Sequence, residues 1–385
     1  MKIKNALVIS ICIITGLLTG CRQTAGFTEE ITSIPDYMPF SFESEYETRR
    51  RELAQIIDNF LTLGDGIFWG SVLVAERGNV IIHNAYGMAC IEQNIKNTTD
   101  TPFQISSVTK QITGAAIIQL MTDGKLNSED TLDMFFRDHE GLENVTVAHL
   151  LAMRGGFGCF VADFLDTPES VTGGPLIEAA LERYEVLELI NTKTVEELEE
   201  HILTNWSGEI LENFRYSNSD YILLGRIIEY VSGMTYAEFI QTRIFDPIGM
   251  TDSGFSDTHK AATPHSSDGR ALIRLPFAVS YSTGGIVSTP EDLNLWLDAY
   301  FGGKLFPETM LEQIFTGSGN YNYGWFFRNE SVWQHPGASP DSRSIIIYDR
   351  DNEIRMILLS NRDHHQVRRI KRELSEKIFN IGIYS

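Results

Sequence analysis

The sequence predicts an α+β fold, in which both ends of the chain build one antiparallel sheet and a mainly helical lobe lies beside it. Strand-like runs of apolar and β-branched residues occur near the beginning of the chain and again near its end. The part between them, about 123–275, has mainly helical patterns interrupted by glycine-rich turns. Because strands must bury their apolar faces, we expect the two sets to share one sheet, with an active-site cleft where sheet and lobe meet.

The first predicted elements are a helix, a hairpin and a second helix. Residues 44–63 have an apolar stripe at helical spacing, formed by Leu53, Ile56, Ile57 and Phe60. Two strand-like runs follow, 70–75 and 80–85, and the residues between them, Glu76-Arg77-Gly78-Asn79, have the composition of a hairpin turn. A long apolar helical segment, Ile112 to Met121, comes next.

Further helices and then strands complete the predicted fold. The clearest helices of the middle are 194–203, 220–231 and 236–244, and its glycine-rich breaks are 154–156 and 172–174. Near the C-terminus the expected strands are 323–327, 331–334, 344–348 and 354–360. Asp349-Arg350-Asp351-Asn352 supplies the turn between the last two strands, and a closing helix is expected at about 364–379.

The N-terminus has the pattern of an export signal. A short basic segment, Met1–Asn5, precedes the apolar stretch Ala6–Leu18, which is too short to span a bilayer comfortably. Leu18-Thr19-Gly20-Cys21 resembles the lipobox of bacterial lipoproteins, in which the cysteine thiol carries the lipid. We therefore expect three parts: a lipoprotein signal peptide at 1–20, a flexible tether at 21–40 that starts at the lipidated Cys21, and one folded domain at 41–385. The alternative is an ordinary secretory signal with an incidental cysteine.

The net charge limits the classes of partner that the protein can bind, and the cysteines limit the possible disulfides. With 31 Lys and Arg against 52 Asp and Glu, the net charge of −21 argues against nucleic acid and against adhesion to anionic lipid. Contact with the membrane is therefore expected through the lipid on Cys21 alone. Outside the signal and Cys21, only Cys90 and Cys159 remain, and a disulfide or two buried thiols are both open.

The most informative motif is Ser107-Val108-Thr109-Lys110, at the head of a long apolar helix. A hydroxyl becomes a good nucleophile when a neighbouring base takes its proton, and residues three apart share a helix face. Burial in an apolar helix disfavours the ammonium form, so Lys110 is a candidate base for Ser107. The free N–H groups of the helix start suit a developing oxyanion. The alternative is a solvated lysine, since chance alone supplies roughly one Ser-x-x-Lys in such a chain.

A second motif, Tyr216-Ser217-Asn218, lies just ahead of the predicted helix 220–231. In an extended segment, residues two apart project to the same side, so Tyr216 and Asn218 are expected to face one cleft. A phenol can relay a proton, and a side-chain amide can hold a substrate carbonyl. The alternative is a buried tyrosine and an asparagine near a helix cap.

A third motif, His335-Pro336-Gly337-Ala338, lies between two strand-like segments. His335 could polarise or orient a substrate, and Gly337 permits a close approach of the strand. The backbone N–H of Ala338 could complete an oxyanion hole with that of Ser107. The alternative is a strand-end histidine without a role.

Together these motifs resemble the serine β-lactamase and penicillin-binding-protein superfamily, in particular its class C β-lactamase-like branch with related esterases and D-amino-acid peptidases. The likeness covers roughly 63–360, and its supporting phrases are 103–120, 216–233, 247–250, 282–289 and 323–325. It implies a β-lactamase/transpeptidase-like fold. It also implies Ser107 as the acylated nucleophile, Lys110 as its base, and Tyr216 as a partner in proton transfer. Asn218, His335, Gly337 and Ala338 are then substrate-binding positions, and no metal or other cofactor is needed.

The chain also departs from the family pattern. His335 occupies the place of a lysine, which removes a fixed anchor for a substrate carboxylate and favours a peptidase or esterase over a β-lactamase. Met153-Arg154-Gly155-Gly156 stands where a His-Thr-Ser-Gly phrase is common, and Ile210-Leu211 stands near the usual Pro-Gly. Asp341 and Arg343 are expected to put extra charge near the cleft mouth.

The sequence therefore predicts a monomeric, exported, lipid-anchored serine hydrolase of the cell envelope, which acts by an acyl-enzyme on a D-amino-acid peptide, an ester or a β-lactam. A catalytically silent envelope lipoprotein that binds peptidoglycan or a partner is the alternative. A Ser-His-Asp hydrolase has little support, because no Gly-x-Ser-x-Gly elbow occurs. Asp363-His364-His365 lacks the ligand spacing of a metal site.

Overall fold

The computed structural model describes residues 42–62, 68–168, 188–256, 261–266, 269–272, 277–315, 319–339 and 342–362, together with residues 370, 372 and 374. The chain divides into two units, Met1–Tyr46 and Glu47–Ser385, and of the first only residues 42–46 are described. The predicted signal peptide, Cys21 and the tether lie outside the described residues and stay predictions. Among the helices described, none combines the length and the apolar character needed to cross a bilayer.

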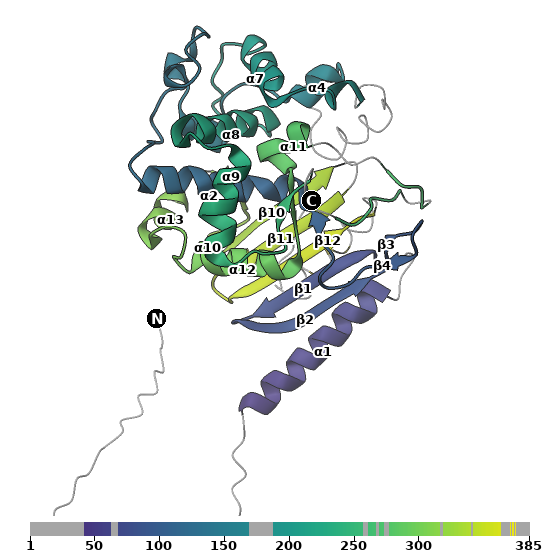
Figure 1. The fold of residues 1–385 in the computed structure, drawn as a ribbon. Helices are drawn as coiled ribbons and strands as arrows, with labels where there is room; N and C mark the ends of the chain where they lie inside the picture. Colours follow the sequence, from purple (N-terminus) through teal and green to yellow (C-terminus); the bar gives the residue numbers. More distant parts are fainter. Residues whose placement is uncertain are drawn as a thin grey trace, which may run out of the picture. The chain divides into compact units, whose positions relative to one another are not determined.

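Both ends of the described chain contribute to one antiparallel sheet of seven strands, in the order β2-β1-β12-β11-β10-β9-β8 (Figure 1). The bounds are β1 Gly70–Glu76, β2 Asn79–Tyr86, β8 Tyr321–Asn322, β9 Trp325–Phe327, β10 Val332–Ser339, β11 Ser342–Asp349 and β12 Ile354–Ser360. The N-terminal hairpin joins the C-terminal strands through β1 and β12, with Val74 opposite Met356. The predicted sharing of one sheet by the two ends of the chain is confirmed.

The central strands β1, β11 and β12 are buried on both faces, and successive residues belong to different cores. Val72, Val74 and Leu358 belong to a core that includes Ile57 and Leu61 of α1 (Phe42–Thr62). Their sequence neighbours on β1 and β12 belong to the larger core under the helical lobe; these are Leu73, Ala75, Ile357 and Leu359. This two-sided burial explains why the strands read as nearly continuous apolar runs, as the alternation of side chains along a strand requires.

Short helices fill the middle of the chain and cover the other face of the sheet (Figure 1). Those of the lobe are α2 Thr109–Thr122, α3 Val147–Leu151, α4 Phe160–Phe164, α7 Val195–Thr204, α8 Asn218–Ser232, α9 Tyr236–Ile240 and α11 Phe277–Gly284. The others are α10 Asp246–Ile248, α12 Pro290–Phe301 and α13 Glu308–Phe315, and single 3-10 turns lie at Ser106–Val108 (η1), Leu132–Met134 and Leu142–Asn144. Two small sheets pair β3 (Met88–Cys90) with β4 (Ile95–Lys96), and β7 (Ile286–Ser288) with β5 (Phe103–Gln104) and β6 (Gly254–Phe255).

The helix boundaries follow capping residues. Thr194 begins α7 with a capping box that includes Glu197, because each side chain accepts from the other residue's backbone N–H. Gly233 ends α8 in the left-handed conformation that glycine adopts without a Cβ penalty. The predicted helix 236–244 continues farther than expected, since a π-helical segment (Gln241–Phe245) connects α9 to α10.

Two strand predictions near the C-terminus need correction. The predicted strand 323–327 is a tight hairpin, because Tyr323 and Gly324 both have positive φ and turn the chain between β8 and β9. The predicted strand 331–334 extends through β10 to Ser339, so His335 lies within a strand and not between two strands. Most of the predicted closing helix lies outside the described residues.

Candidate active site

Ser107 lies in η1, where the helical lobe meets the edge of β10. Ser106 adopts φ 48, and its hydroxyl lies 2.8 Å from Ser339 Oγ and 2.6 Å from Ser342 Oγ. Ser344 Oγ of β11 donates to the carbonyl of Ile105 at 2.6 Å. These hydroxyl contacts fix the backbone on the N-terminal side of Ser107 to the end of the β10–β11 hairpin.

Lys110 is the centre of the site's hydrogen bonding. Its side chain is fully buried, and Nζ lies 3.2 Å from Ser107 Oγ, 2.9 Å from Asn218 Oδ1 and 2.9 Å from the Thr283 carbonyl oxygen. Burial lowers the pKa of Lys110 to about 7. The amide oxygen and the carbonyl can only accept, so a neutral amine gives them its two protons and turns its lone pair toward the Ser107 hydroxyl. This is the arrangement that a general base for Ser107 needs.

Tyr216 contacts the same serine from the lobe. Its hydroxyl donates to Ser107 Oγ at 2.7 Å, and its ring centroid lies 5.1 Å from Lys110 Nζ. Burial raises the pKa of Tyr216 well above its ordinary value, so it is a neutral phenol at physiological pH. Ser107 is therefore in hydrogen-bond contact with one proton acceptor and one proton donor.

Asn218 joins the site by a different backbone geometry from the one predicted. Ser217 is extended and caps α8, whereas Asn218 is the first residue of the helix itself. Tyr216 and Asn218 still converge, because Tyr216 reaches Ser107 while Asn218 reaches Lys110. The expected convergence of the two side chains is confirmed, but the simple alternation along a strand is wrong.

His335 is fully buried within β10, in an aromatic surrounding. Its ring centroid lies 5.1 Å from that of Phe326, 5.8 Å from Tyr321 and 6.5 Å from Tyr216. Nδ1 lies 2.6 Å from the Pro336 carbonyl oxygen, which can only accept, so Nδ1 carries the proton. Nε2 lies 3.4 Å from the Tyr321 hydroxyl.

Gly337 and Ala338 lie beyond the part of β10 that pairs with β9. β9 pairs with β10 only at Trp333 and Gln334, so the following residues of that edge face η1. A Cβ at Gly337 would overlap Ser344 Oγ and the Ile105 carbonyl oxygen. Only glycine lets the strand come this close to the nucleophile's segment. Ala338, paired with Arg343 on the far side, follows directly.

Two contacts of the site were not predicted from the sequence. The Thr283 carbonyl reaches Lys110 because α11 is broken at Tyr281 (φ 26, ψ −124); the phrase 282–289 supported the resemblance but gave Thr283 no role. Cys159 Sγ lies 3.4 Å from Asn218 Nδ2. Cys90 and Cys159 are both free and buried, so of the two open alternatives the pair of thiols is observed.

The expectation of charge at the cleft mouth is wrong for Arg343. Its side chain is buried and donates to the carbonyl oxygens of Ser339 and Ser342, so it stabilises the end of the hairpin. Asp341 lies outside the described residues. The partly exposed side chain near Tyr216 is instead Phe214, 37% exposed, with its ring 5.1 Å from Tyr321 and 5.7 Å from Phe326.

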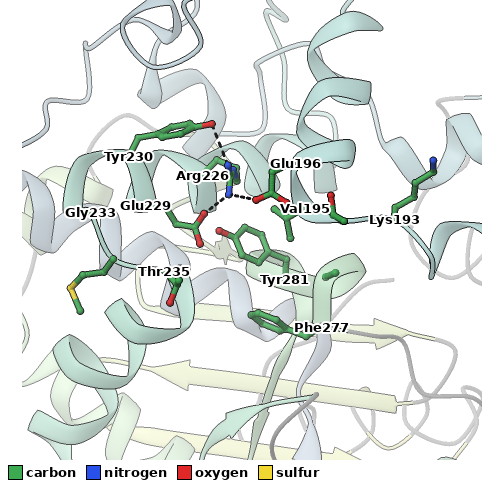
Figure 2. Close-up of a pocket in the computed structure, with 13 residues that line it drawn as sticks. Lys193, Val195, Glu196, Arg226, Glu229, Tyr230, Gly233, Thr235, Phe277 and Tyr281 are labelled. Atoms are coloured by element: carbon green, nitrogen blue, oxygen red, sulfur yellow. Dashed lines mark hydrogen bonds and ion pairs between the residues drawn. The ribbon is translucent and has the colours of Figure 1, made fainter.

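A surface groove of about 710 Å³ lies on another part of the lobe, among α7, α8, α9 and α11 (Figure 2). Phe277 and Tyr281 line one side, and on the other Arg226 pairs with Glu196 and Glu229. None of the predicted site residues lines this groove. In the described part of the chain, no three His, Cys, Asp or Glu side chains gather as a metal site would require.

Comparisons with known proteins agree with the fold. "Protein flp" of Staphylococcus aureus (strain N315) is 25% identical over 359 residues, which is 87% of this chain and 68% of the relative. Among solved structures, FmtA from Staphylococcus aureus superimposes with a TM-score of 0.70 at 20% identity, covering 87% of this chain and 95% of that one. The D-amino acid amidase from Ochrobactrum anthropi SV3 gives 0.67 at 20% identity, covering 86% and 98%. The β-lactamase/transpeptidase-like fold is therefore confirmed.

The family assignment comes from the match of the whole folded region. The Beta-lactamase family model matches residues 53–378, which include Ser107, Lys110, Tyr216 and the β10 strand. The chain belongs to the Beta-lactamase family.

Proposed function

We propose that the protein is a serine hydrolase that cleaves amides or esters through an acyl-enzyme on Ser107. The observation that carries this proposal is the hydrogen bonding of Lys110, a buried amine whose two acceptor partners leave its lone pair toward Ser107. Its lowered pKa, about 7, makes the neutral form abundant at physiological pH.

The residues perform two successive acyl transfers. Lys110 takes the Ser107 proton while Oγ attacks the substrate carbonyl carbon, and the backbone N–H groups of Ser107 and Ala338 stabilise the oxyanion. The C–N or C–O bond then breaks, and the leaving group receives the proton that Lys110 took up, with the Tyr216 hydroxyl as the relay. Water attacks the ester in the same way, releases the acid and returns the proton to Ser107.

His335 in the place of a lysine supports amides and esters over β-lactams. Unlike a lysine, a histidine is not a permanent cation at physiological pH, so it offers no fixed anchor to a substrate carboxylate. Phe214, Phe326 and Tyr321 give this side of the site an aromatic character. A D-amino acid amidase shares the fold, which supports an amide as one natural bond type.

The chain's location at the cell envelope is part of the proposal. The lipobox-like segment that ends in Cys21 supports export and a lipid anchor. In cells fed a labelled fatty acid, label should enter the wild-type chain and be lost in Cys21→Ala. A Cys21→Ala chain that keeps both the label and its membrane fraction would refute the anchor.

Active-site labelling tests the reaction. The purified protein is exposed separately to a fluorophosphonate and to a labelled penicillin, and the adduct is located by mass spectrometry. We expect a fluorophosphonate adduct on Ser107, none in Ser107→Ala, and none on the neighbouring Ser106. Weak or absent penicillin labelling would agree with the replacement of a lysine by His335.

The silent-binder alternative predicts a different result. A folded wild-type protein that resists both reagents and still binds peptidoglycan would refute the hydrolase proposal. The Ser107→Ala protein, with a wild-type melting temperature, is the matched control for that binding measurement.

A further inference from the structure

Behind the catalytic side chains lies a carboxyl group that the proposed mechanism does not use. Asp220, in the first turn of α8, is completely buried. Its Oδ1 lies 2.6 Å from Ser217 Oγ, and its Oδ2 accepts from the backbone N–H of Gly155 at 3.0 Å. Ser217 separates Tyr216 from Asn218, so this carboxyl holds the segment that carries two predicted site residues.

The glycine loop around Gly155 is fitted to this carboxyl. A Cβ at Gly155 would come within 3.0 Å of Asp220 Oδ2 and 2.8 Å of Phe157. The backbone N–H of Ser217 also lies 3.4 Å from Met153 Sδ, and that of Arg215 donates to the Met153 carbonyl at 3.2 Å. Residues 153–156, which depart from the family pattern, thus pack against the Tyr216–Asn218 segment and hold it in place. Asp220 connects these two segments.

The hydrogen bonds around Ser217 Oγ distinguish the neutral from the ionised form of Asp220. Ser217 Oγ has one hydrogen, yet two acceptors lie at 2.6 Å: the Gly158 carbonyl oxygen and Asp220 Oδ1. Ser217 Oγ also accepts from the backbone N–H of Asp220 at 3.0 Å. An ionised Asp220 would compete with Gly158 for the single hydrogen and leave one buried acceptor without it. A protonated carboxyl donates to Ser217 Oγ, which in turn donates to Gly158, and every contact is satisfied.

We propose that Asp220 is held as the neutral carboxylic acid and acts as a positioning residue for Tyr216 and Asn218. The proposal rests on the proposed function only for its kinetic consequence. The carboxyl touches neither Ser107 nor Lys110; it acts through Ser217. In support, burial raises the pKa of Asp220 to about 7.

The surrounding charges do not convert Asp220 into an ordinary ion pair. The hydrogen bonds with Ser217 and the Gly155 N–H, and then the charge of Arg215, lower the pKa of Asp220, but less than burial raises it. Asp220 in turn contributes to the raised pKa of Tyr321 on β8. Groups on the other packed elements have partners of their own: Lys110 on α2 with Asn218, Arg154 with the Leu211 carbonyl, Cys159 with Asn218, and His149 on α3 with Thr146.

Deprotonation of Asp220 should therefore lower both the rate of acylation and the stability of the fold. Above the raised pKa, Asp220 ionises and competes with the Gly158 carbonyl oxygen for the single Ser217 hydrogen, so Tyr216 and Asn218 lose their fixed position. Acylation should fall on the alkaline side while Lys110 becomes a better base, which gives a bell-shaped profile. The unfolded chain ionises at an ordinary aspartate pKa, so the stability that the neutral acid contributes is complete below that value and declines as the pH rises toward 7.

Two variants separate positioning from packing. Asp220→Asn keeps a donor for Ser217 Oγ and an acceptor for the Gly155 N–H, but it cannot ionise. We expect acylation by a fluorophosphonate within about threefold of wild type near pH 7 and no alkaline decline. Asp220→Ala should lose at least about tenfold at every pH, chiefly in kcat for an ester substrate.

Asp292→Asn is the matched control, because Asp292 is also buried and accepts from a serine, Ser253, and from the backbone N–H of Asp252. It should change stability without changing the shape of the pH profile. An Asp220→Asn protein that keeps the wild-type alkaline decline, or loses as much activity as Asp220→Ala, would overturn the proposal.

A measurement without substrate keeps this test distinct from that of the hydrolase proposal. Thermal unfolding of wild type and Asp220→Asn is compared from about pH 4 to pH 8. We expect Asp220→Asn to gain stability relative to wild type as the pH rises, even if neither protein acylates any reagent. A constant difference between the two would refute a neutral Asp220, whatever the outcome of active-site labelling.

Discussion

On the lobe side of Ser107, hydrogen bonds of 2.7 to 3.2 Å link the buried Lys110 and the partly buried Tyr216 and Asn218 to the site. On the sheet side, β10 instead approaches with its backbone at Gly337 and with the ring of His335 among aromatic neighbours. In the proposed function, the lobe side holds the groups that move protons, whereas the sheet side would set shape and substrate preference. Changes on the lobe side should therefore cost reaction rate at any substrate, and changes on the sheet side should cost stability or selectivity.

The largest effect is expected for Lys110→Ala. The base and the partner of Asn218 and Thr283 are lost together, so the rate of acylation should fall by about 10³-fold or more. Burst kinetics with a fluorogenic ester measures this directly. A loss below about tenfold would show that Lys110 is not the base. Gln119→Ala, on the same helix but bonded to the Arg243 carbonyl, is the control for helix packing.

Tyr216→Phe should cost less, about 10²-fold, because the ring packing stays and only the proton relay is lost. The deficit should be larger for an amide than for an ester, since an amine leaving group needs the proton more. Comparing kcat for a matched amide and ester pair measures the difference. Equal losses on both substrates would contradict a relay role.

The acid side of the pH–rate profile tests the role of Lys110, on the lobe side, without any mutation. Because the pKa of Lys110 is lowered to about 7, the neutral base becomes tenfold scarcer with each pH unit below that value. Acylation at about pH 5 should therefore be roughly fiftyfold slower than at pH 7, where about half of Lys110 is neutral. A rate that is flat over this range would contradict a lysine base.

Gly337→Ala tests the sheet side. The added Cβ would overlap Ser344 Oγ and the Ile105 carbonyl oxygen, so we expect a loss of about 1–3 kcal/mol in the free energy of unfolding and a rise in KM. Chemical denaturation and steady-state kinetics measure both. Gly302→Ala, whose Cβ would overlap the Asp298 carbonyl oxygen away from the site, should destabilise without changing KM. An unaltered KM in Gly337→Ala would contradict a role of the sheet side in substrate binding.

The sequence predicted what side-chain chemistry and periodicity encode. The apolar runs of β1 and β12 predicted the shared sheet, and Ser107, Lys110, Tyr216 and Asn218 converge as expected. It could not predict the Thr283 contact with Lys110, because a backbone carbonyl has no residue signature and is aimed by a break in α11. Asp220 was hidden for another reason: an acidic residue three positions after a serine cap is ordinary at a helix start.

The misplacement of His335 and Arg343 has a common cause. Pro336 and Gly337 disfavour a regular strand locally, yet the pairing with Ile345 and Ser344 carries β10 through both residues. Arg343 alternates with its neighbours on a fully buried strand, so its charge turns to the hairpin's own carbonyl oxygens. Both outcomes depend on the pairing of β10 with β11, which the residue types at these positions do not reveal on their own.

The pairing of β1 with β12 also determines when the site can exist. Ser71 lies opposite Leu359, and His335 belongs to a strand that reaches β1 only through β11 and β12. Sheets closed by such remote contacts form late and slowly compared with local hairpins and helices. A chain still leaving the ribosome would carry Ser107 and Lys110 long before it carried the strand that faces them. The arrangement of Ser107, Lys110 and β10 would therefore be complete only at the end of folding, so Ser107 would have little opportunity to react before the sheet has formed.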